Sequence, residues 1–531
     1  MRQGSLVSAY HTWRQAIAAL DPAAATATRG FPESADLPEM GPEVVRDSVA
    51  KLQLVLEDVR WLESVSLEGN AKADLALLRA RAEADLVEWA ELRRAERDAS
   101  WSTRVARQAF EVEAQRTSAS TDLLSRKLRD LPRYLTAARA MLRFPSRQHV
   151  VAADGEAQSL AAALERAVSG AFAASAPGIR EGAEAARRAI EDHRSWIRDQ
   201  RDLEPLGHHS IGRTILQKWL SAEAGEEVST RELAALAEEE LGAARKRLEA
   251  LATAMVPDAI SVEQALEMAL ERLDAARPRS EEEVPGTADA ALASARALAN
   301  SVITVPLGVP AFARATALPG ASYELLGAPS AVNASFTVGL PPREMAPVRR
   351  GELYKALSAP RLTTAALREG TPGRALAAAI RSQFPEGLRR SVTSRAAEEG
   401  WPAYAAPMAL REAGSSVEPL VQLAGILDEL ASAARALVVT RIHDGRMTLA
   451  EAAALFRERA LLGRERAERE AQRCAVEPRC ALEVLGKRRF EQIARELQRG
   501  AGRSARDVND ALVSLGALPP AALRDLLRPG R

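Results

Sequence analysis

Hydrophobic positions recur at three- and four-residue intervals along most of this 531-residue chain, with polar residues between them. This is the period of an α-helix that buries one face. The clearest case is residues 45–62, where the apolar stripe consists of Val49, Leu52, Leu54, Val55, Val59 and Leu62. Four further segments share the period, and we predict helices over residues 73–92, 123–142, 161–172 and 183–197. Ala, Leu, Arg and Glu, which favour helix, dominate the chain, so the pattern predicts a mostly α-helical fold.

Helix starts are marked by capping residues. Ser229, Ser261 and Thr448 are each followed three residues later by Glu or Gln, which is the spacing of a capping box. Ser504 is followed at the same distance by Asp507, a weaker variant of the motif. These signals predict where helices begin and carry no information about function.

The helical pattern is interrupted twice. Residues 277–286 form a charged connector with two prolines, which predicts a boundary between an N-terminal helical lobe, 1–277, and a second lobe, 278–531. Residues 302–347 are rich in Pro, Gly and β-branched side chains, and the best strand candidates within them are 302–305 and 334–338. We therefore expect a large multi-helix body with a small mid-chain β-sheet.

Composition excludes several classes of protein. Lys and Arg together number 72, as do Asp and Glu, so the chain lacks the basic excess that nucleic-acid binding requires. The basic run at residues 487–489 is interpreted as a solvated helix face. Cys474 and Cys480 are the two cysteines of the sequence, too few for a disulfide framework or a cysteine-rich zinc site. We expect two unpaired thiols in a reducing compartment.

The chain shows no targeting or membrane signal of the usual kind. Its first residues, MRQGSL, lack the apolar run of a signal peptide. The most apolar stretch, residues 298–313, is short and contains two prolines, so it does not fit a membrane span. We expect a cytoplasmic protein that contacts neither membrane nor nucleic acid, although a processed exported form would have the same appearance.

Three blocks in the C-terminal half carry the candidate chemistry. Residues 368–375 read REGTPGRA, residues 399–404 read EGWPAY, and residues 435–443 read RALVVTRIH. In this order they resemble the HExxPGHH, EGWxxY and RLVVDxGxH blocks of the bacterial domain-of-unknown-function 885 family, whose members look like zinc metallopeptidases. Further similarity to that family covers residues 212–233, 447–452, 470–481 and 508–519, so it extends over most of the chain.

The resemblance implies a zinc site with a defined division of roles. In an HE-type motif the imidazoles bind zinc, and the neighbouring glutamate polarises a metal-bound water. By resemblance Glu369 is the counterpart of that glutamate, and Glu399 is the counterpart of the carboxylate ligand. His443 and Arg473 are the other polar groups of the family's blocks that this chain retains.

The positions of the family's three histidines in the first block are occupied by Arg368, Arg374 and Ala375. A guanidinium stays protonated and has no lone pair to donate, so it cannot bind zinc. One interpretation is that an arginine replaces the charge of a lost dication by pairing with Glu369 or Glu399. The other is that the arginines bind an anionic group such as a peptide carboxylate. We favour the ion pair, because the later blocks have lost polar groups as well.

The sequence therefore predicts a metal-free, cofactor-free and catalytically inactive relative of a zinc metallopeptidase family. We expect it to bind a peptide or protein partner in a central cleft, through Arg368, Arg374, Glu399, Trp401 and Tyr404. The relict catalytic positions are Glu369, His443 and Arg473. The alternative is a hydrolase that retains activity through Glu369 and His443, although His443 is equally well interpreted as a structural histidine at a helix end. The sequence does not determine the oligomeric state.

Overall fold

The computed structural model places two compact units on one chain. Unit 1 comprises Met1–Glu68, Arg81–Ile211 and Glu386–Val392, and unit 2 comprises Gly69–Ala80, Gly212–Pro385 and Thr393–Arg531. The boundary predicted at residue 277 lies within unit 2, which contains the chain from Gly212 onward except for Glu386–Val392. The structure describes residues 5–22, 36–65, 67–114, 121–169, 177–202, 208–306, 314–319, 326–328, 335–341, 343 and 345–528.

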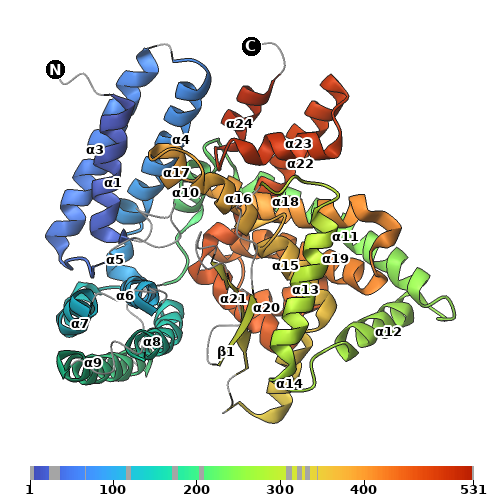
Figure 1. The fold of residues 1–531 in the computed structure, drawn as a ribbon, viewed down its shortest axis with the longest axis horizontal. Coiled ribbons are helices and arrows are strands. Elements are labelled where there is room, and N and C mark those ends of the chain that lie inside the picture. Colours follow the sequence, from blue (N-terminus) through green and yellow to red (C-terminus); the bar gives the residue numbers. More distant parts are fainter. Residues whose placement is uncertain are drawn as a thin grey trace. The chain divides into compact units, whose positions relative to one another are not determined.

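The secondary-structure elements described in unit 1 are helices joined by short loops (Figure 1). Its elements are α1 (Leu6–Leu20), α3 (Pro42–Ser64), the second part of α4 (Gly69–Leu86), the π-helix η1 (Val87–Glu91), α5 (Arg94–Arg97), α6 (Ala99–Ala114), α7 (Thr121–Met141), α8 (Arg147–Val168), α9 (Pro177–Asp202) and the short α17 (Leu388–Ser391). Helices α6 and α8 pack against each other, as do α7 and α9 and the pair α1 and α3.

The helices predicted in this unit are confirmed, with shifts at their ends and faces. The buried stripe of α3 includes Leu52, Val55 and Val59 as predicted, but Leu54 is half-exposed and Leu56 is buried in its place. Both sequence neighbours of Val55 are leucines, and the spacing alone does not show which of the two lies on the buried face of the helix. The helix predicted over 161–172 belongs to α8, and its last predicted residue, Phe172, lies outside the described residues.

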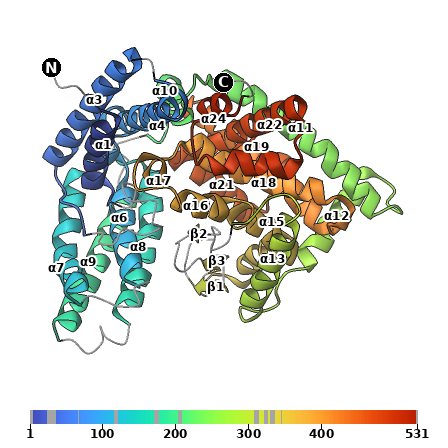
Figure 2. The ribbon, with the colours of Figure 1, turned by 45° about the horizontal axis from the view of Figure 1, so that its top comes forward.

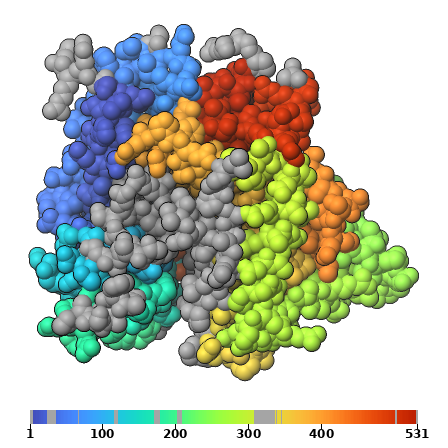
Figure 3. Space-filling view, viewed as in Figure 1, coloured from blue at the N-terminus to red at the C-terminus, as the bar shows by residue number. Residues whose placement is uncertain are grey.

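Unit 2 holds most of the remaining elements. These are the first part of α4, α10 (Arg213–Ala224), α11 (Thr230–Met255), α12 (Val262–Ala275), α13 (Glu283–Ala299), α14 (Pro347–Lys355), α15 (Ala359–Glu369), α16 (Arg374–Ser382), α18 (Arg395–Ala413), η2 (Gly414–Ser416), α19 (Pro419–His443), α20 (Leu449–Arg459), α21 (Arg464–Val476), η3 (Pro478–Ala481), α22 (Leu482–Ala501), α23 (Ala505–Ser514) and α24 (Pro520–Leu527). In Figure 3 the outer face of α13, drawn in yellow-green, lies on the surface of this unit. Capping boxes at Ser229, Thr448 and Ser504 are confirmed, whereas Ser261 caps α12 without a reciprocal bond from Gln264.

Helix α19 is the centre of unit 2. It contacts α11, α15, α18, α20, α21 and α22. Figure 2 shows it among α11, α18, α21 and α22. The helix is apolar on all sides over most of its length, with Leu423, Leu430 and Val438 fully buried, and such a helix is stable only when other elements surround it. Two of its few charged side chains, Glu429 and Arg435, are buried as well, so each needs an oppositely charged partner from a neighbouring helix.

Helices α18 and α22 cross at two glycines. A Cβ atom added at Gly400 would lie 2.4 Å from the Cα of Gly486, and one added at Gly486 would lie 2.1 Å from the carbonyl oxygen of Ala396. The backbones therefore touch where they cross, and no larger residue fits without moving a helix. This close crossing fixes the first turns of α18, which carry Glu398 and Glu399, against α22.

The small sheet is present, with boundaries that differ in part from the prediction. Its strands are β1 (Arg314–Pro319), β2 (Leu326–Ala328) and β3 (Ser335–Leu340), in the order β1-β3-β2, with β1 parallel and β2 antiparallel to β3. The strand predicted over 334–338 corresponds to β3. The strand predicted over 302–305 is wrong, because this segment is a turn after α13 in which the amide of Ile303 donates to the carbonyl of Ala299.

Candidate functional site

A tight turn between α15 and α16 brings together the charged residues of the 368–375 block. Helix α15 ends at Glu369 and α16 begins at Arg374, and the amide of Gly373 donates to the carbonyl of Leu367 at 3.0 Å. A Cβ atom at Gly373 would lie 1.8 Å from the carbonyl oxygen of Arg368, so the turn requires glycine at this position. Four residues separate the two helices, and the side chains of Glu369 and Arg374 meet beside this turn.

Arg374 forms ion pairs with both glutamates that the sequence singled out. Its Nε donates to Oε2 of Glu369 at 2.9 Å, and its Nη2 donates to Oε2 of Glu399 at 2.9 Å. The three side chains are largely buried, with exposed fractions of 23%, 14% and 20% for Arg374, Glu369 and Glu399. The predicted pairing of an arginine of this block with these two glutamates is therefore present, and Arg374 is the arginine that makes it.

A proline in α18 provides Arg374 with a third acceptor. Pro402 has no N–H, so the carbonyl of Glu398, four residues earlier, lacks its helical donor. Nη1 of Arg374 lies 3.4 Å from this carbonyl oxygen and donates to it. The guanidinium thus contacts two carboxylates and one carbonyl, and these groups hold it from three directions.

Arg368, the other arginine of the block, belongs to a longer series of alternating charges. Its Nη2 lies 2.8 Å from Oε2 of Glu483 and its Nε lies 3.8 Å from Oε1 of Glu369. Glu483 also accepts from Nη1 of Arg435 at 2.9 Å, and Arg435 is bidentate on Glu470 at 2.7 and 3.0 Å. We call this series, from Arg374 through Glu369, Arg368, Glu483 and Arg435 to Glu470, the arginine–glutamate chain.

Several members of the arginine–glutamate chain have pKa values shifted towards their charged forms. Burial opposes the charge of Arg374, but Glu399 and the other nearby carboxylates outweigh it and raise the pKa of Arg374 well above its ordinary value. Burial also opposes ionisation of Glu470, but the charge of Arg435 outweighs it and lowers the pKa of Glu470 to about 2. The same balance, with Arg368 as the main cation, lowers the pKa of Glu483 below its ordinary range. Each charge thus depends on its neighbours in the chain.

Trp401 and Tyr404 are buried beside this site. The indole N–H of Trp401 donates to the carbonyl of Pro372 at 2.9 Å and so holds the turn between α15 and α16. The hydroxyl of Tyr404 donates to Oδ1 of Asn509 on α23 at 2.8 Å. The exposed fractions of Trp401 and Tyr404 are 3% and 5%. Their contacts fix the turn and α23, and neither ring lines the cavity described below.

His443 and Arg473 lie away from the turn. His443 is the last residue of α19, is fully buried, and bonds through Nε2 to the carbonyl of Cys474 at 3.0 Å. It follows Arg435 by eight residues, which corresponds to about 12 Å along the helix. Arg473 on α21 bonds to Glu477 at 3.4 Å and is one of the cations that lower the pKa of Glu470.

The sequence did not identify several members of this network. Arg435 and Glu470 lie within blocks that resemble the family, but Glu483 lies in none of them. Glu483 stands inside the apolar run CALEVL, residues 480–485, and an isolated charge in such a run is a usable signal of a buried ion pair. The interpretation of residues 487–489 as a solvated face is wrong, since Lys487 is 9% exposed and bonds to Glu240 at 2.5 Å and Glu429 at 2.9 Å.

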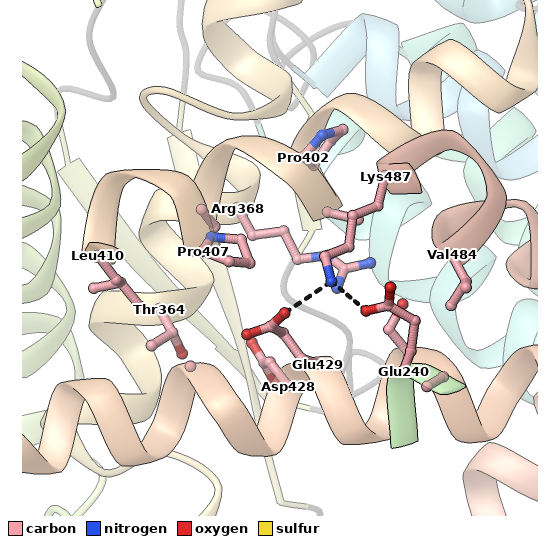
Figure 4. Close-up of a pocket in the computed structure, with 15 residues that line it drawn as sticks. Glu240, Thr364, Arg368, Pro402, Pro407, Leu410, Asp428, Glu429, Val484 and Lys487 are labelled. Carbon is pink, nitrogen blue, oxygen red and sulfur yellow. Dashed lines mark hydrogen bonds and ion pairs between the residues drawn. The ribbon is translucent and has the colours of Figure 1, made fainter. Parts of the chain in front are cut away.

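A small cavity lies next to the arginine–glutamate chain (Figure 4). Its walls come from α11, α15, α18, α19 and α22, and its lining residues include Thr364, Arg368, Pro407, Leu410 and Lys487. The space open to the centres of water-sized molecules has a volume of about 30 Å³, enough for about two waters. Figure 4 shows the ammonium group of Lys487 between the carboxylates of Glu429 and Glu240 at one side of the cavity.

Among the described residues, no three or more His, Cys, Asp and Glu side chains are grouped so that they could hold a metal ion. No helix in the same part of the chain has both the length and the apolar character needed to cross a membrane.

Known proteins share the fold and the family of this chain. Two solved structures share the fold. One is described as "a putative lipoprotein of unknown function" from Shewanella oneidensis, with a TM-score of 0.72, 18% identity, and coverage of 98% of this chain and 99% of that chain. The other is described as "the putative lipoprotein" from Colwellia psychrerythraea, with a TM-score of 0.73, 16% identity, and coverage of 98% of both chains. No curated protein matched. The family model for bacterial proteins of unknown function DUF885 matches residues 22–527, so the chain belongs to this family.

Proposed function

We propose that this protein is a metal-free, catalytically silent member of its family that binds a peptide or protein partner. The observation that supports the first half of this proposal is the position of Arg374, whose guanidinium is bonded at 2.9 Å to both Glu369 and Glu399. These are the two carboxylates that a zinc site of the implied kind would use. In this chain an arginine bonds to both of them.

The side chains present do not fit a catalytic zinc ion. Such a site needs three protein ligands with free lone pairs and an open position for water. Here the positions implied for imidazoles hold Arg368, Arg374 and Ala375. A zinc ion between Glu369 and Glu399 would have to displace the guanidinium, which then would be a buried cation without a partner. We therefore derive no catalytic step through a metal.

The binding role rests on the neighbouring cavity and on its polar walls. The cavity is lined by Arg368 of the arginine–glutamate chain, and by the charged side chains of Asp428 and Lys487. Concave sites with a few placed polar groups among apolar walls are the usual sites of ligand recognition. The ion pairs keep the helices around the cavity in position without a metal. They can therefore maintain the fold in a protein that has no catalytic activity.

The alternative function, hydrolysis by Glu369 and His443, has less support. A general base must reach the proton it removes. Glu369 is held by Arg374, and the ring of His443 is fully buried against the carbonyl of Cys474. Hydrolysis through this pair would require both groups to leave their present partners.

Metal content tests the proposal directly. We expect elemental analysis of the purified protein, equilibrated with zinc and passed through a desalting column, to find no zinc beyond the amount in E369Q/E399Q, the matched control that removes both carboxylates. We also expect peptidase assays to give the same rate for both proteins, with and without a chelator. About one zinc per wild-type chain that is lost in E369Q/E399Q would overturn the metal-free claim. Chelator-sensitive cleavage by the wild type alone would overturn the inactive state.

A positive control restores the family's motif. The variant R368H/R374H/A375H returns the three imidazoles to the block, and we expect it to bind more zinc than the wild type in the same measurement. If its zinc content equals that of E369Q/E399Q, the loss of metal binding cannot be assigned to these three positions.

We also propose a cellular location for the protein. The expected cytoplasmic location has no support, because the two solved structures of the same fold are described as putative lipoproteins. We propose the alternative, an exported protein. Fractionation of the native host tests this, and recovery of the protein with cytoplasmic markers alone would refute it.

A further inference from the structure

We propose that the cavity between α18 and α19 binds a primary ammonium group on a short aliphatic stem, with Asp428 as its counter-ion. Such a group occurs in a lysine side chain and at a peptide amino terminus. This inference deepens the proposed binding role and rests on it. It is based on the hydrogen-bond donors and acceptors that line the cavity and on the apolar side chains of the remaining wall.

The cations in the wall already have partners. The ammonium of Lys487 lies 2.5 Å from Glu240 and 2.9 Å from Glu429 (Figure 4). The guanidinium of Arg368 lies 2.8 Å from Glu483. An anionic ligand would have to break one of these buried pairs, and removal of one partner from such a pair is costly. The wall is therefore poorly suited to an anion.

Two neighbouring carboxylates in the cavity wall, those of Glu429 and Asp428, differ in their ion pairs. Glu429 pairs with Lys487 and also accepts from Arg247 at 2.9 Å, so its charge is balanced. Asp428, the preceding residue on α19, differs from it. Within the described residues its one ion pair is to Nη2 of Arg466 at 4.0 Å, the outer limit for such a contact. Its side chain is 34% exposed, so a ligand can reach the carboxylate.

Helix α18 contains a carbonyl that lacks its usual helical donor. Pro407 interrupts the hydrogen bonds of α18, because it has no N–H to donate to the carbonyl of Ala403 four residues earlier. Ala403 and Pro407 both line the cavity. An ammonium group has three donors and no acceptor, so a carboxylate and a carbonyl on facing helices suit it.

The remaining wall favours an aliphatic stem. Pro407, Leu410 and Val484 present apolar side chains to the cavity. Gly425 makes room for one of them, because a Cβ atom at this position would lie 2.5 Å from Cδ1 of Leu410. The cavity, which has room for about two waters, admits the ammonium group with the methylene next to it and excludes a ring. A lysine side chain or the amino terminus of a peptide combines these properties.

Binding of three small peptides by isothermal titration calorimetry tests the inference. The first is an N-acetylated tripeptide amide with a central lysine, the second replaces this lysine by the neutral norleucine, and the third is a triglycine amide with a free amino terminus. We expect at least one cationic peptide to bind the wild type about tenfold more tightly than the norleucine peptide, which is the value of one charge-assisted hydrogen bond. The cationic peptide that binds identifies the source of the ammonium group.

Two variants and one control locate the site. We expect D428N to abolish the tenfold preference, and E412Q, which neutralises an exposed carboxylate elsewhere on α18, to retain it. We expect G425A to weaken binding of every peptide at least fivefold, because its methyl group must displace Leu410 within the cavity. Melting curves of the variants show whether they are folded. Equal binding of the lysine and norleucine peptides, a preference that survives in D428N, or unchanged binding to G425A would each overturn the inference.

These outcomes separate the inference from the proposed function. If the peptides bind without dependence on Asp428, the ammonium site is wrong while a peptide-binding role stands. If none of the three peptides binds at millimolar concentration, the ammonium site is overturned, while the wider role in binding a peptide or protein partner is decided by other ligands. The metal-free state is decided by zinc content alone.

Discussion

Replacing Arg374 by methionine is the sharpest test of the interpretation of the site. The substitution keeps the length of the aliphatic stem and removes the guanidinium. It leaves Glu369 and Glu399 as two largely buried carboxylates that have lost a shared partner at 2.9 Å. It also removes the donor to the carbonyl of Glu398.

The expected loss follows from the contacts. Breaking a buried ion pair by removing one partner costs about 3 to 5 kcal/mol. The side chains here keep exposed fractions between 14% and 23%, so water reduces the effect. We therefore expect R374M to lower the free energy of unfolding of this region by about 2 to 3 kcal/mol. We expect R374M/E369Q/E399Q, in which both carboxylates become neutral amides, to regain more than half of this loss, because an unpaired buried charge costs more than an absent one.

Hydrogen exchange followed by mass spectrometry is the appropriate assay. It reports on peptides from α15, α16 and α18 separately from unit 1, whereas a single unfolding curve for a chain of two units does not isolate one region. The matched control is R457M, which removes an exposed arginine on α20. If R374M exchanges like R457M, or if the two amides restore nothing, then the ion pairs do not stabilise the site and the reasoning fails.

Three further predictions concern the same unit. G486A is expected to lower the free energy of unfolding, measured by chemical denaturation, by at least about 3 kcal/mol, because its methyl group would meet backbone atoms of α18 at 2.1 to 2.5 Å. In the same measurement G242A, on an open face of α11, should be neutral or stabilising. A small loss in G486A would contradict the close crossing. Burial opposes the charge of Glu398, but its arginine neighbours outweigh burial and lower its pKa from an ordinary value of 4.5 to about 2. The stabilisation from this carboxylate is therefore present above pH 4.5 and is lost as the pH falls from 4.5 to 2. E398Q should reduce the loss of stability at acid pH by about 3 kcal/mol, and an unchanged acid limb would refute this. The sulfurs of Cys474 and Cys480 lie 3.9 Å apart in a buried pair, about 2 Å beyond a disulfide bond. We expect protein isolated from an oxidising compartment, where a disulfide oxidoreductase accepts the two electrons, to show no thiol on titration after denaturation. Protein made in a reducing cytoplasm should show both thiols, and free thiols in both preparations would refute the prediction.

Much of the local structure was predictable from the sequence. The helices of unit 1 and the capping boxes at Ser229, Thr448 and Ser504 follow from residue spacing, because backbone geometry and one-sided burial impose a period on the chain. Strand β3 was also found, since its β-branched and aromatic residues stand out between polar turns. The segment 302–305 misled for the same reason, because a short apolar run in a buried turn has the composition of a strand.

The chemistry at the site was predictable only in part. That Arg368 and Arg374 cannot bind zinc follows from the guanidinium alone. Which of the two would pair with both Glu369 and Glu399 does not, because the choice depends on the turn at Gly373 and on the direction of α18. The involvement of Glu483 depends on a helix more than one hundred residues away in the sequence, and no local pattern encodes such a distance.

The sequence by itself determined the helical class, the positions of helix starts, and the presence of arginines rather than imidazoles at positions 368 and 374, since each of these depends on residues close together in the chain. Only the tertiary structure decided which charges are buried and which partners they have. A run such as residues 487–489 looks like a solvated face until α11 and α19 place Glu240 and Glu429 beside Lys487. Burial and ion pairing depend on which helices meet, and this is a property of the whole fold rather than of any segment.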